Sequence, residues 1–457
     1  MGSRPQRCLK PHTRSKQVLE TLRAYESQNL LCTDPALDWP LVWQRAKGMF
    51  VWDLDGNRYL DATSAFGVAN CGHSNSNVTT AGCKQLKEMT HAMGDVHPHS
   101  KKAELARLLS DVVFPDWHRE TKNRIGNTSK IRGKTIFCNS GFEAVEAALK
   151  TALLATGRAG VLALEGAYHG LGYGALNTTH REMFRHPFAS QLSKFGTFLP
   201  FPLNDFQTRQ TLSRATALAR STKYGAILIE PIQGRGGVRP LSAELIIGLR
   251  RVATEHRMVF IADEIFTGFG RTGSMLALHH FEIFADVYCL GKGLTGGFPL
   301  SACVGSADLM DRAWPPSEGE SIHTSTFLGH PVGCAMALAQ VKEIEQRQLC
   351  KRALMMGEFA MSQFLKLQMK HPGVVTTVRG KGLMLGIELN QAAIKQETAI
   401  GVLVMRKMAG LGWIVLPEGP EANILSFTPP LIITKRQILG FTNALDQILC
   451  ELSRAVA

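Results

Sequence analysis

Short apolar runs alternate with longer stretches of helical periodicity through the middle of the chain. The apolar runs lie at residues 135–138, 161–164, 226–230, 259–263, 287–290 and 302–305. Between several of them, as at 142–156 and 243–256, apolar residues recur every three or four positions, which is typical of amphipathic helices. Strands that alternate with helices predict βα units. We therefore expect an α/β fold with a mainly parallel sheet flanked by helices.

The pattern changes after about residue 330. One long helical stretch is followed by two hairpin-like strands within residues 374–389 and by a helix near 399–409. Such a mixture is typical of an α+β unit. The sequence therefore predicts a second, smaller domain at the C-terminal end.

Composition narrows the class of protein. Of the 457 residues, 45% are hydrophobic and 19% are charged, as in an ordinary globular protein, and no apolar run approaches the roughly 20 residues of a membrane-spanning helix. Lysine and arginine outnumber aspartate and glutamate by 51 to 38, a net charge of +13, so a nucleic-acid partner has to be considered. The basic residues are scattered and are not interleaved with aromatic residues that could stack on bases. We expect a basic solvated surface, with no nucleic-acid and no membrane partner.

The cysteines and the N-terminal residues bear on location. None of the ten cysteines forms a C-x-x-C pair, and Cys138, Cys289 and Cys303 fall within apolar runs, as buried thiols in a reducing compartment would. The first nineteen residues hold five basic residues, no acidic residue and no apolar core, which favours a free basic tail over a secretory leader. We expect a cytoplasmic protein without disulfides.

Four segments carry candidate chemistry. In the first, Ser140 and Glu143 have the spacing of a helix capping box, and the glycine between them, Gly141, makes the helix start a candidate phosphate site; most capping boxes only cap a helix. In the second, Tyr168 precedes a histidine and three glycines and could lie flat on a planar ring or pack in a turn.

The third and fourth segments also follow apolar strands. Asp263 and Glu264 end one strand, at the edge where α/β sheets bind ligands, and a buried Asp263 would need a positive partner such as a protonated ring nitrogen. Lys292 lies between Gly291 and Gly293. A desolvated lysine there would lose pKa and become an imine-forming amine; a flexible surface turn is the alternative.

Together and in this order, these segments resemble the class III, fold type I aminotransferases, which depend on pyridoxal 5′-phosphate (PLP). The resemblance spans nearly the whole chain. It rests on VWDLDGNRYLD at 51–61, GH at 72–73, EPIQG at 230–234, DEI at 263–265, GKG at 291–293, TFLGHP at 326–331, RGKGLM at 379–384 and PPL at 429–431.

The resemblance implies roles for particular residues. Lys292 would form the internal aldimine with PLP and later move the substrate proton, and Asp263 would keep the pyridinium nitrogen protonated so that the ring acts as an electron sink. Tyr168 and Ile265 would cover the two faces of the ring. The implied cofactor-binding set is Ser140, Gly141, Phe142, Tyr168, His169, Glu230, Asp263, Ile265, Lys292 and Thr326. Thr326 would reach the phosphate of the partner subunit, so the resemblance implies a homodimer with shared active sites.

The same resemblance implies a domain plan and an activity. Residues 1–60 would contribute to the small domain and to the active-site entrance, residues 61–330 would form the large PLP-binding domain, and residues 331–457 the small domain. The implied reaction moves an amino group from an amine or ω-amino donor to a keto acid of the pyruvate or 2-oxoglutarate type, in two half-reactions.

Departures from the family pattern concern the substrate. Ser426 and Arg235 stand where members acting on α-amino acids or γ-aminobutyrate usually carry an arginine and a glutamate. A buried carboxylate needs a charged fork or several hydrogen-bond donors, and serine offers one. Arg235 could bind the substrate carboxylate instead, or it could form only a surface salt bridge. Alternatively, the amino donor has no carboxylate near its reacting amine. Trp39, Trp43 and Phe66 would then lie at the mouth of the pocket.

Other departures and alternatives stay open. Phe142 replaces a small or hydroxyl residue, and Phe266 replaces a glutamine that often reaches the cofactor ring. An epimerase, aminomutase or decarboxylase could use the same Lys292 and Asp263, and a non-catalytic basic homologue is a further alternative. No metal is expected, because no cysteine or carboxylate with ligand spacing joins His91, His97 and His99.

Overall fold

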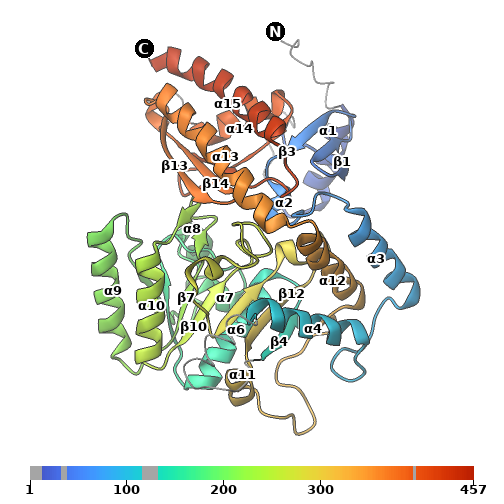
Figure 1. Ribbon diagram of the computed structural model, residues 1–457, viewed down its shortest axis with the longest axis vertical. Coiled ribbons are helices and arrows are strands. Elements are labelled where there is room, and N and C mark those ends of the chain that lie inside the picture. Colours follow the sequence, from blue (N-terminus) through green and yellow to red (C-terminus); the bar gives the residue numbers. More distant parts are fainter. Residues whose placement is uncertain (1–12, 32–38, 116–131, 395–397, 457) are drawn as a thin grey trace.

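A seven-stranded sheet forms the centre of the computed structural model, which describes residues 13–31, 39–115, 132–394 and 398–456 (Figure 1). Its strand order is β4-β12-β11-β10-β7-β5-β6. The strands are β4 (Gly133–Cys138), β5 (Gly160–Leu164), β6 (Gly196–Leu199), β7 (Tyr224–Ile229), β10 (Val259–Asp263), β11 (Val287–Leu290) and β12 (Ser301–Ser306). β12 is antiparallel to both of its neighbours, and the remaining pairs are parallel. The expected mainly parallel α/β sheet is confirmed, and β6 is a strand that the apolar pattern missed.

Both faces of this sheet are buried. Along β10, Phe260 and Ala262 belong to one apolar cluster while Val259 and Ile261 belong to another, because successive side chains of a strand point to opposite faces. Helix α6 (Gly141–Thr156) supplies alanines to the second cluster. Burial on both faces explains why these strands read as continuous apolar runs and not as an alternating pattern.

Helices cover the two faces and link the strands. Figure 1 shows α9 (Asp205–Ala219) and α10 (Ala243–Glu255) side by side at one end of the sheet, and α4 (Ser100–Val113) near β4 at the other. Further helices among the described residues of this part are α2 (Ser64–Gly67), α3 (Ser76–Glu88), α7 (Tyr173–Leu176), α8 (Glu182–Arg185) and α11 (Ala307–Ala313), with the 3₁₀ turns η1 (His186–Phe188), η2 (Ala277–Phe281) and η3 (Lys292–Leu294).

The C-terminal part is an α+β layer, as the sequence predicts. The sheet order is β13-β14-β17-β16, and the expected hairpin is β13 (Val375–Lys381) with β14 (Met384–Leu389). The other elements are β16 (Leu416–Glu418), β17 (Ile424–Phe427), η4 (Gln391–Ala393), α14 (Ile400–Gly410) and α15 (Lys435–Val456). The long helix expected after residue 330 is in fact two helices, α12 (Pro331–Gln346) and α13 (Leu349–Lys370), because Gln348 adopts a left-handed φ of 48° that interrupts the helix.

The N-terminal strands join the C-terminal part. β1 (Trp43–Lys47), β2 (Phe50–Asp53) and β3 (Arg58–Asp61) form a sheet with β15 (Trp413–Ile414), which runs parallel to β3, and both groups lie together at the top of Figure 1. This pairing supports the assignment of residues 1–60 to the smaller unit; the boundaries at 60 and 330 stay predictions. A small two-stranded sheet joins β8 (Ile232–Gln233) to β9 (Arg239–Pro240).

The expectation of a free tail over the first nineteen residues is wrong for residues 13–19. These residues begin helix α1 (Thr13–Tyr25). The backbone N–H groups of Arg14 and Ser15 donate to the Asp55 carboxylate at 2.8 and 3.1 Å, and Leu19 is buried. Residues 1–12 lie outside the described part.

Two expectations about the whole chain can be compared with the described residues. The eight cysteines within them are all free thiols. No helix in these ranges combines the length and the apolarity that a membrane crossing would need.

Candidate active site

The candidate residues lie where parallel strands end. Ser140 follows β4, Tyr168 follows β5, Glu230 follows β7, Asp263 ends β10 and Lys292 follows β11. Because the carboxyl ends of parallel strands meet at one edge of a sheet, five segments far apart in the sequence converge there. A cavity of about 400 Å³ opens at this edge. Its walls include Gly141, Phe142, Tyr168, His169, Glu230, Arg235, Asp263, Ile265, Phe266 and Lys292.

The local backbone holds Lys292 in a constrained position. Lys292 has a φ of +42°, in the left-handed region that non-glycine residues seldom adopt. A Cβ on the neighbouring Gly293 would lie 2.4 Å from Asn70 Nδ2, so a glycine is required there. The Lys292 ammonium lies 4.0 Å from the ring centroid of Phe266. The glycines around Lys292 therefore belong to a closely packed wall and not to a flexible surface turn.

Burial lowers the pKa of Lys292, while the charges of Asp263, Glu230 and Glu418 act in the opposite direction. Removing an ammonium from water disfavours its charged form. The neutral amine is the nucleophilic form. The surroundings of Lys292 therefore suit a lysine that forms a bond to carbon.

Asp263 is buried and held by two contacts. Its Oδ2 lies 2.8 Å from His169 Nδ1, and its Oδ1 accepts a hydrogen bond from the Ile265 backbone N–H at 3.1 Å. His169 Nε2 is buried and has no hydrogen-bond partner among the described residues. An unpartnered buried nitrogen beside a carboxylate on a cavity wall fits the polar edge of a heterocyclic ring.

The start of helix α6 fits a phosphate group. Glu143 accepts hydrogen bonds from the backbone N–H groups of Asn139 and Ser140 at 2.7 and 3.3 Å, while Ser140 Oγ is buried and has no partner among the described residues. A Cβ on Gly141 would lie 3.2 Å from the Ile265 side chain. The free hydroxyl and the first N–H groups of a 16-residue helix suit an anion.

Glu230 fixes the loop that carries Tyr168. The backbone N–H groups of Tyr168 and Gly234 donate to its two carboxylate oxygens at 3.0 and 3.1 Å. Burial raises the pKa of Glu230 and the nearby Asp263 adds to this, while His169 opposes it. Glu230 therefore shapes the cavity wall through the backbone.

One charged residue at this site, Glu418, gave no signal in the sequence. It ends β16, and its Oε2 lies 3.8 Å from Arg235 Nε. The side chain of Arg235 is 39% exposed and that of Glu418 only 6%. The Arg235 guanidinium also lies 5.5 Å from the ring centroid of Tyr168. Arg235 thus lines the cavity and also forms an ion pair, but with a buried partner.

Several of the expected residues, including Ser140 and Trp43, are not among those that line this cavity. Trp39 packs against the main apolar core, and Phe66 is 55% exposed with a φ of +62°. Ser426 is buried in β17 opposite Leu416 and Gly386. Thr326 is exposed and lies outside the cavity walls.

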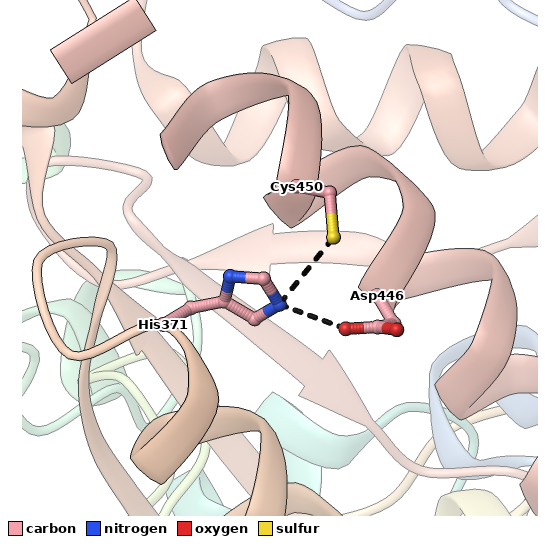
Figure 2. A group of neighbouring side chains, drawn as sticks. All are labelled: His371, Asp446 and Cys450. Atoms are coloured by element: carbon pink, nitrogen blue, oxygen red, sulfur yellow. Dashed lines mark hydrogen bonds and ion pairs between the residues drawn. The ribbon is translucent and has the colours of Figure 1, made fainter. Parts of the chain in front are cut away.

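A separate cluster of possible metal ligands lies between α13 and α15 (Figure 2). His371 Nε2 is 2.7 Å from Asp446 Oδ1 and 4.0 Å from Cys450 Sγ. Lys370 Nζ also donates to Asp446, at 2.6 Å, and His371 Nδ1 lies 3.0 Å from Ser453 Oγ. Because a lysine already neutralises the carboxylate and both ring nitrogens have partners, this cluster connects two helices and does not present open metal ligands.

Comparison with known proteins identifies the family. The model of the family described as "Aminotransferase class-III" matches residues 33–449. The acetylornithine aminotransferase of Methanosarcina acetivorans is 33% identical over 409 residues, which cover 89% of this chain and 91% of that protein. The 5-aminovalerate aminotransferase DavT of Pseudomonas aeruginosa is 32% identical, covering 87% and 91% of the two chains.

A solved structure agrees with these relatives. The ornithine aminotransferase of Toxoplasma gondii, described with partial occupancy of PLP at its active site, has a TM-score of 0.80 and 26% identity, and the match covers 96% of this chain and 94% of that one. The fold, the cavity at the carboxyl edge of the sheet and these matches lead to one conclusion. The chain belongs to the class III aminotransferases, enzymes that use pyridoxal 5′-phosphate to transfer amino groups.

Proposed function

We propose that this enzyme transfers an amino group from an amine or ω-amino donor to a keto acid of the pyruvate or 2-oxoglutarate type. The observation that carries the proposal is that Lys292 and Asp263 line one cavity, the first with a lowered pKa and the second held by His169. The relatives named for acetylornithine and 5-aminovalerate support an ω-amino donor.

In this proposal the chain's residues divide the work. PLP, when bound, supplies an electron sink for the carbon that carries the amino group. Lys292 would hold the cofactor covalently and would also move the proton at the substrate carbon. Asp263, oriented by His169, holds a proton on the ring nitrogen. Tyr168 and Ile265 enclose the ring, and Glu230 keeps the Tyr168 loop in place.

The phosphate end of the cofactor would lie at the start of α6. The Ser140 hydroxyl and the backbone N–H groups of Gly141 and Phe142 would bind it, with Thr326 of the partner subunit. The bulk of Phe142 removes one side-chain hydrogen bond that a hydroxyl residue would offer. Because Thr326 would come from a second subunit, we propose a homodimer. We also propose a cytoplasmic location, because free thiols persist in a reducing compartment.

Arg235 is the proposed contact for a substrate carboxylate. It lines the cavity, and a guanidinium can bind a carboxylate with two parallel hydrogen bonds. Arg235→Ala should then raise the apparent Michaelis constant for the keto acid. An unchanged constant would remove Arg235 as the contact for the keto-acid carboxylate.

Absorption spectra test the proposed reaction. The purified holoenzyme should show the visible band of lysine-bound PLP, and Lys292→Ala should abolish it, whereas the control Lys84→Ala, at an exposed position, should keep it. An amine donor should bleach the band and a keto acid should restore it. Bleaching that no keto acid reverses, or product formation without a second substrate, would contradict amino transfer and favour a one-substrate reaction. A colourless protein that cannot be reconstituted would contradict both.

A further inference from the structure

The buried carboxylate of Glu418 lacks the contacts that such a group normally has. Its side chain is 6% exposed, yet no described residue donates a hydrogen bond to it, and its ion pair with Arg235 Nε is 3.8 Å long, which exceeds hydrogen-bond length. Arg235 Nε is itself buried without a hydrogen-bond partner. An acceptor and a hydrogen-bond donor therefore lie side by side, and neither is satisfied.

This pair belongs to the active-site region. Arg235 lines the cavity and faces Tyr168. The charge of Glu418 acts on the pKa of both Lys292 and Tyr168. Arg181 is a second cation near the pair, since the charges of Arg235 and Glu418 both act on its pKa. The end of the cavity near Arg235 thus carries both signs of charge.

The two charges have consequences for substrate choice. A substrate carboxylate that binds Arg235 approaches Glu418, a like charge in a poorly hydrated place, and this repulsion disfavours donors with a carboxylate alone. A donor that carries an ammonium group beside its carboxylate removes the repulsion and supplies the hydrogen bonds that Glu418 lacks. An ammonium-carboxylate pair is therefore more complementary to Arg235 and Glu418 than a lone carboxylate, and the keto acid should bind this pair more weakly than such a donor.

We propose that Glu418 is a specificity-determining residue, which together with Arg235 binds the free α-amino-carboxylate end of a diamino-acid donor while the terminal amine of that donor reaches Lys292. This inference rests on the proposed amino transfer. It deepens that proposal by naming the donor class and the residue that selects it. Neither the family match nor the sequence pattern marks position 418.

Three donors that share a run of four carbons starting at the terminal amine separate the two contacts. Ornithine carries both groups at its far end, 5-aminopentanoate carries only the carboxylate, and 1,4-diaminobutane carries only the ammonium. The holoenzyme should be bleached fastest by ornithine at equal concentration. Glu418→Gln should lower the ratio of ornithine to 5-aminopentanoate rates by roughly ten-fold or more, the usual effect of a lost charged hydrogen bond. Arg235→Gln should instead lower the ratio of ornithine to 1,4-diaminobutane rates.

Ratios measured within one preparation are independent of how much of a variant folds. Glu388→Gln is the matched control, because Glu388 lies on β14 of the same sheet, pairs with Arg379 and does not line the cavity. Its ratios should equal those of the wild type. If amines bleach the holoenzyme but Glu418→Gln leaves the ratios unchanged, the inference fails and the proposed function stands.

Calorimetry separates the opposite case. If no amine bleaches the holoenzyme, ornithine binding that weakens in Glu418→Gln but not in Glu388→Gln would support the subsite while the proposed function fails. Ornithine binding that is equal in both variants, or absent in the wild type, would overturn the inference as well.

Discussion

The amine of Lys292 determines the pH range in which the enzyme can acquire its cofactor. Only the neutral amine attacks a carbonyl carbon, and burial lowers the pKa of Lys292 below its ordinary value of 10.5. The nearby carboxylates of Asp263, Glu230 and Glu418 limit that decrease. The pH dependence of cofactor attachment therefore reports on the charges of the cavity.

The rate at which apoenzyme binds PLP covalently should rise with pH and level off at a midpoint below 10.5, the ordinary lysine pKa. The sign follows from burial, which favours the neutral amine. Glu418→Gln removes a charge that raises the pKa of Lys292, so the midpoint should move to lower pH. Stopped-flow absorbance across a pH series measures both midpoints. A wild-type midpoint at or above 10.5, or a shift to higher pH in the variant, would contradict this account.

At the scale of elements, local sequence signals were sufficient for the centre of the sheet and insufficient at its margins. The strands that end at Asp263 and just before Lys292 are buried on both faces. Their sequences are therefore continuous apolar runs, which predict buried strands of a parallel sheet. β6 and the three-residue β16 are short and only partly buried, and their pairing depends on distant residues. Glu418 was missed for that reason, since a contact between residues 235 and 418, where the Gly419 N–H also donates to the Arg235 backbone oxygen at 3.3 Å, leaves no local signal in the sequence.

In the candidate site, too, some residues could be predicted from the sequence and others could not. The positions at strand ends could be predicted because topology brings them to one edge. Phe66 and Trp39 are expected at the mouth of the pocket, but neither side chain lines the cavity. Phe66 has a left-handed backbone conformation, and Trp39 packs against the apolar core. Contacts between a side chain of the α/β part and one of the α+β part, such as Arg235 with Glu418, cannot be predicted from local sequence patterns.

The contact between α13 and α15 is held by charge, and its strength should depend on pH. Burial raises the pKa of Asp446, but hydrogen bonds from Lys370 and His371 outweigh it and the net shift is downward. A carboxyl whose pKa is lower in the folded state stabilises the fold above its ordinary pKa of 3.8, and this contribution is lost as pH falls through the lowered value.

Asp446→Asn should therefore lower the free energy of unfolding by about 1–2 kcal/mol at pH 7, the usual value for hydrogen bonds to a charged group. The difference from wild type should shrink as pH falls below 3.8 and through the lowered pKa of the folded state, because the carboxyl then becomes protonated in both states. Urea unfolding at several pH values measures it. The exposed Glu358→Gln on α13, the helix that α15 packs against, is the control. A difference that persists unchanged at low pH would show that charge is not the cause.

At the scale of the whole molecule, the buried Arg271 connects segments from distant parts of the chain. Its guanidinium donates to Ser64 Oγ and Asn70 Oδ1, and to the backbone oxygens of Leu383 and Pro429. The side chain is fully buried. One residue of the large part is thereby bonded to the start of that part and to two segments of the C-terminal part.

Arg271→Met should lower the free energy of unfolding by about 3–5 kcal/mol, because four oxygens lose a charged hydrogen-bond donor in a place that water does not reach. Thermal and urea denaturation of the holoenzyme measure the loss, with Arg209→Met at an exposed position of α9 as the control. If the urea midpoints of Arg271→Met and the wild type overlap, so that the change is below about 1 kcal/mol, water or neighbouring groups replace these hydrogen bonds.

The proposed sharing of active sites between two subunits can be tested by mixing two inactive proteins. Lys292→Ala lacks the reactive amine, and Thr326→Glu would place a carboxylate where the partner's phosphate should bind. If Thr326 serves the partner's cavity, each mixed dimer contains one site with an intact Lys292 and an intact Thr326. Random exchange of subunits should then restore about a quarter of wild-type activity, because half of the dimers are mixed and half of their sites are intact. If Thr326 serves its own subunit, both sites of a mixed dimer carry one lesion, and mixing restores nothing.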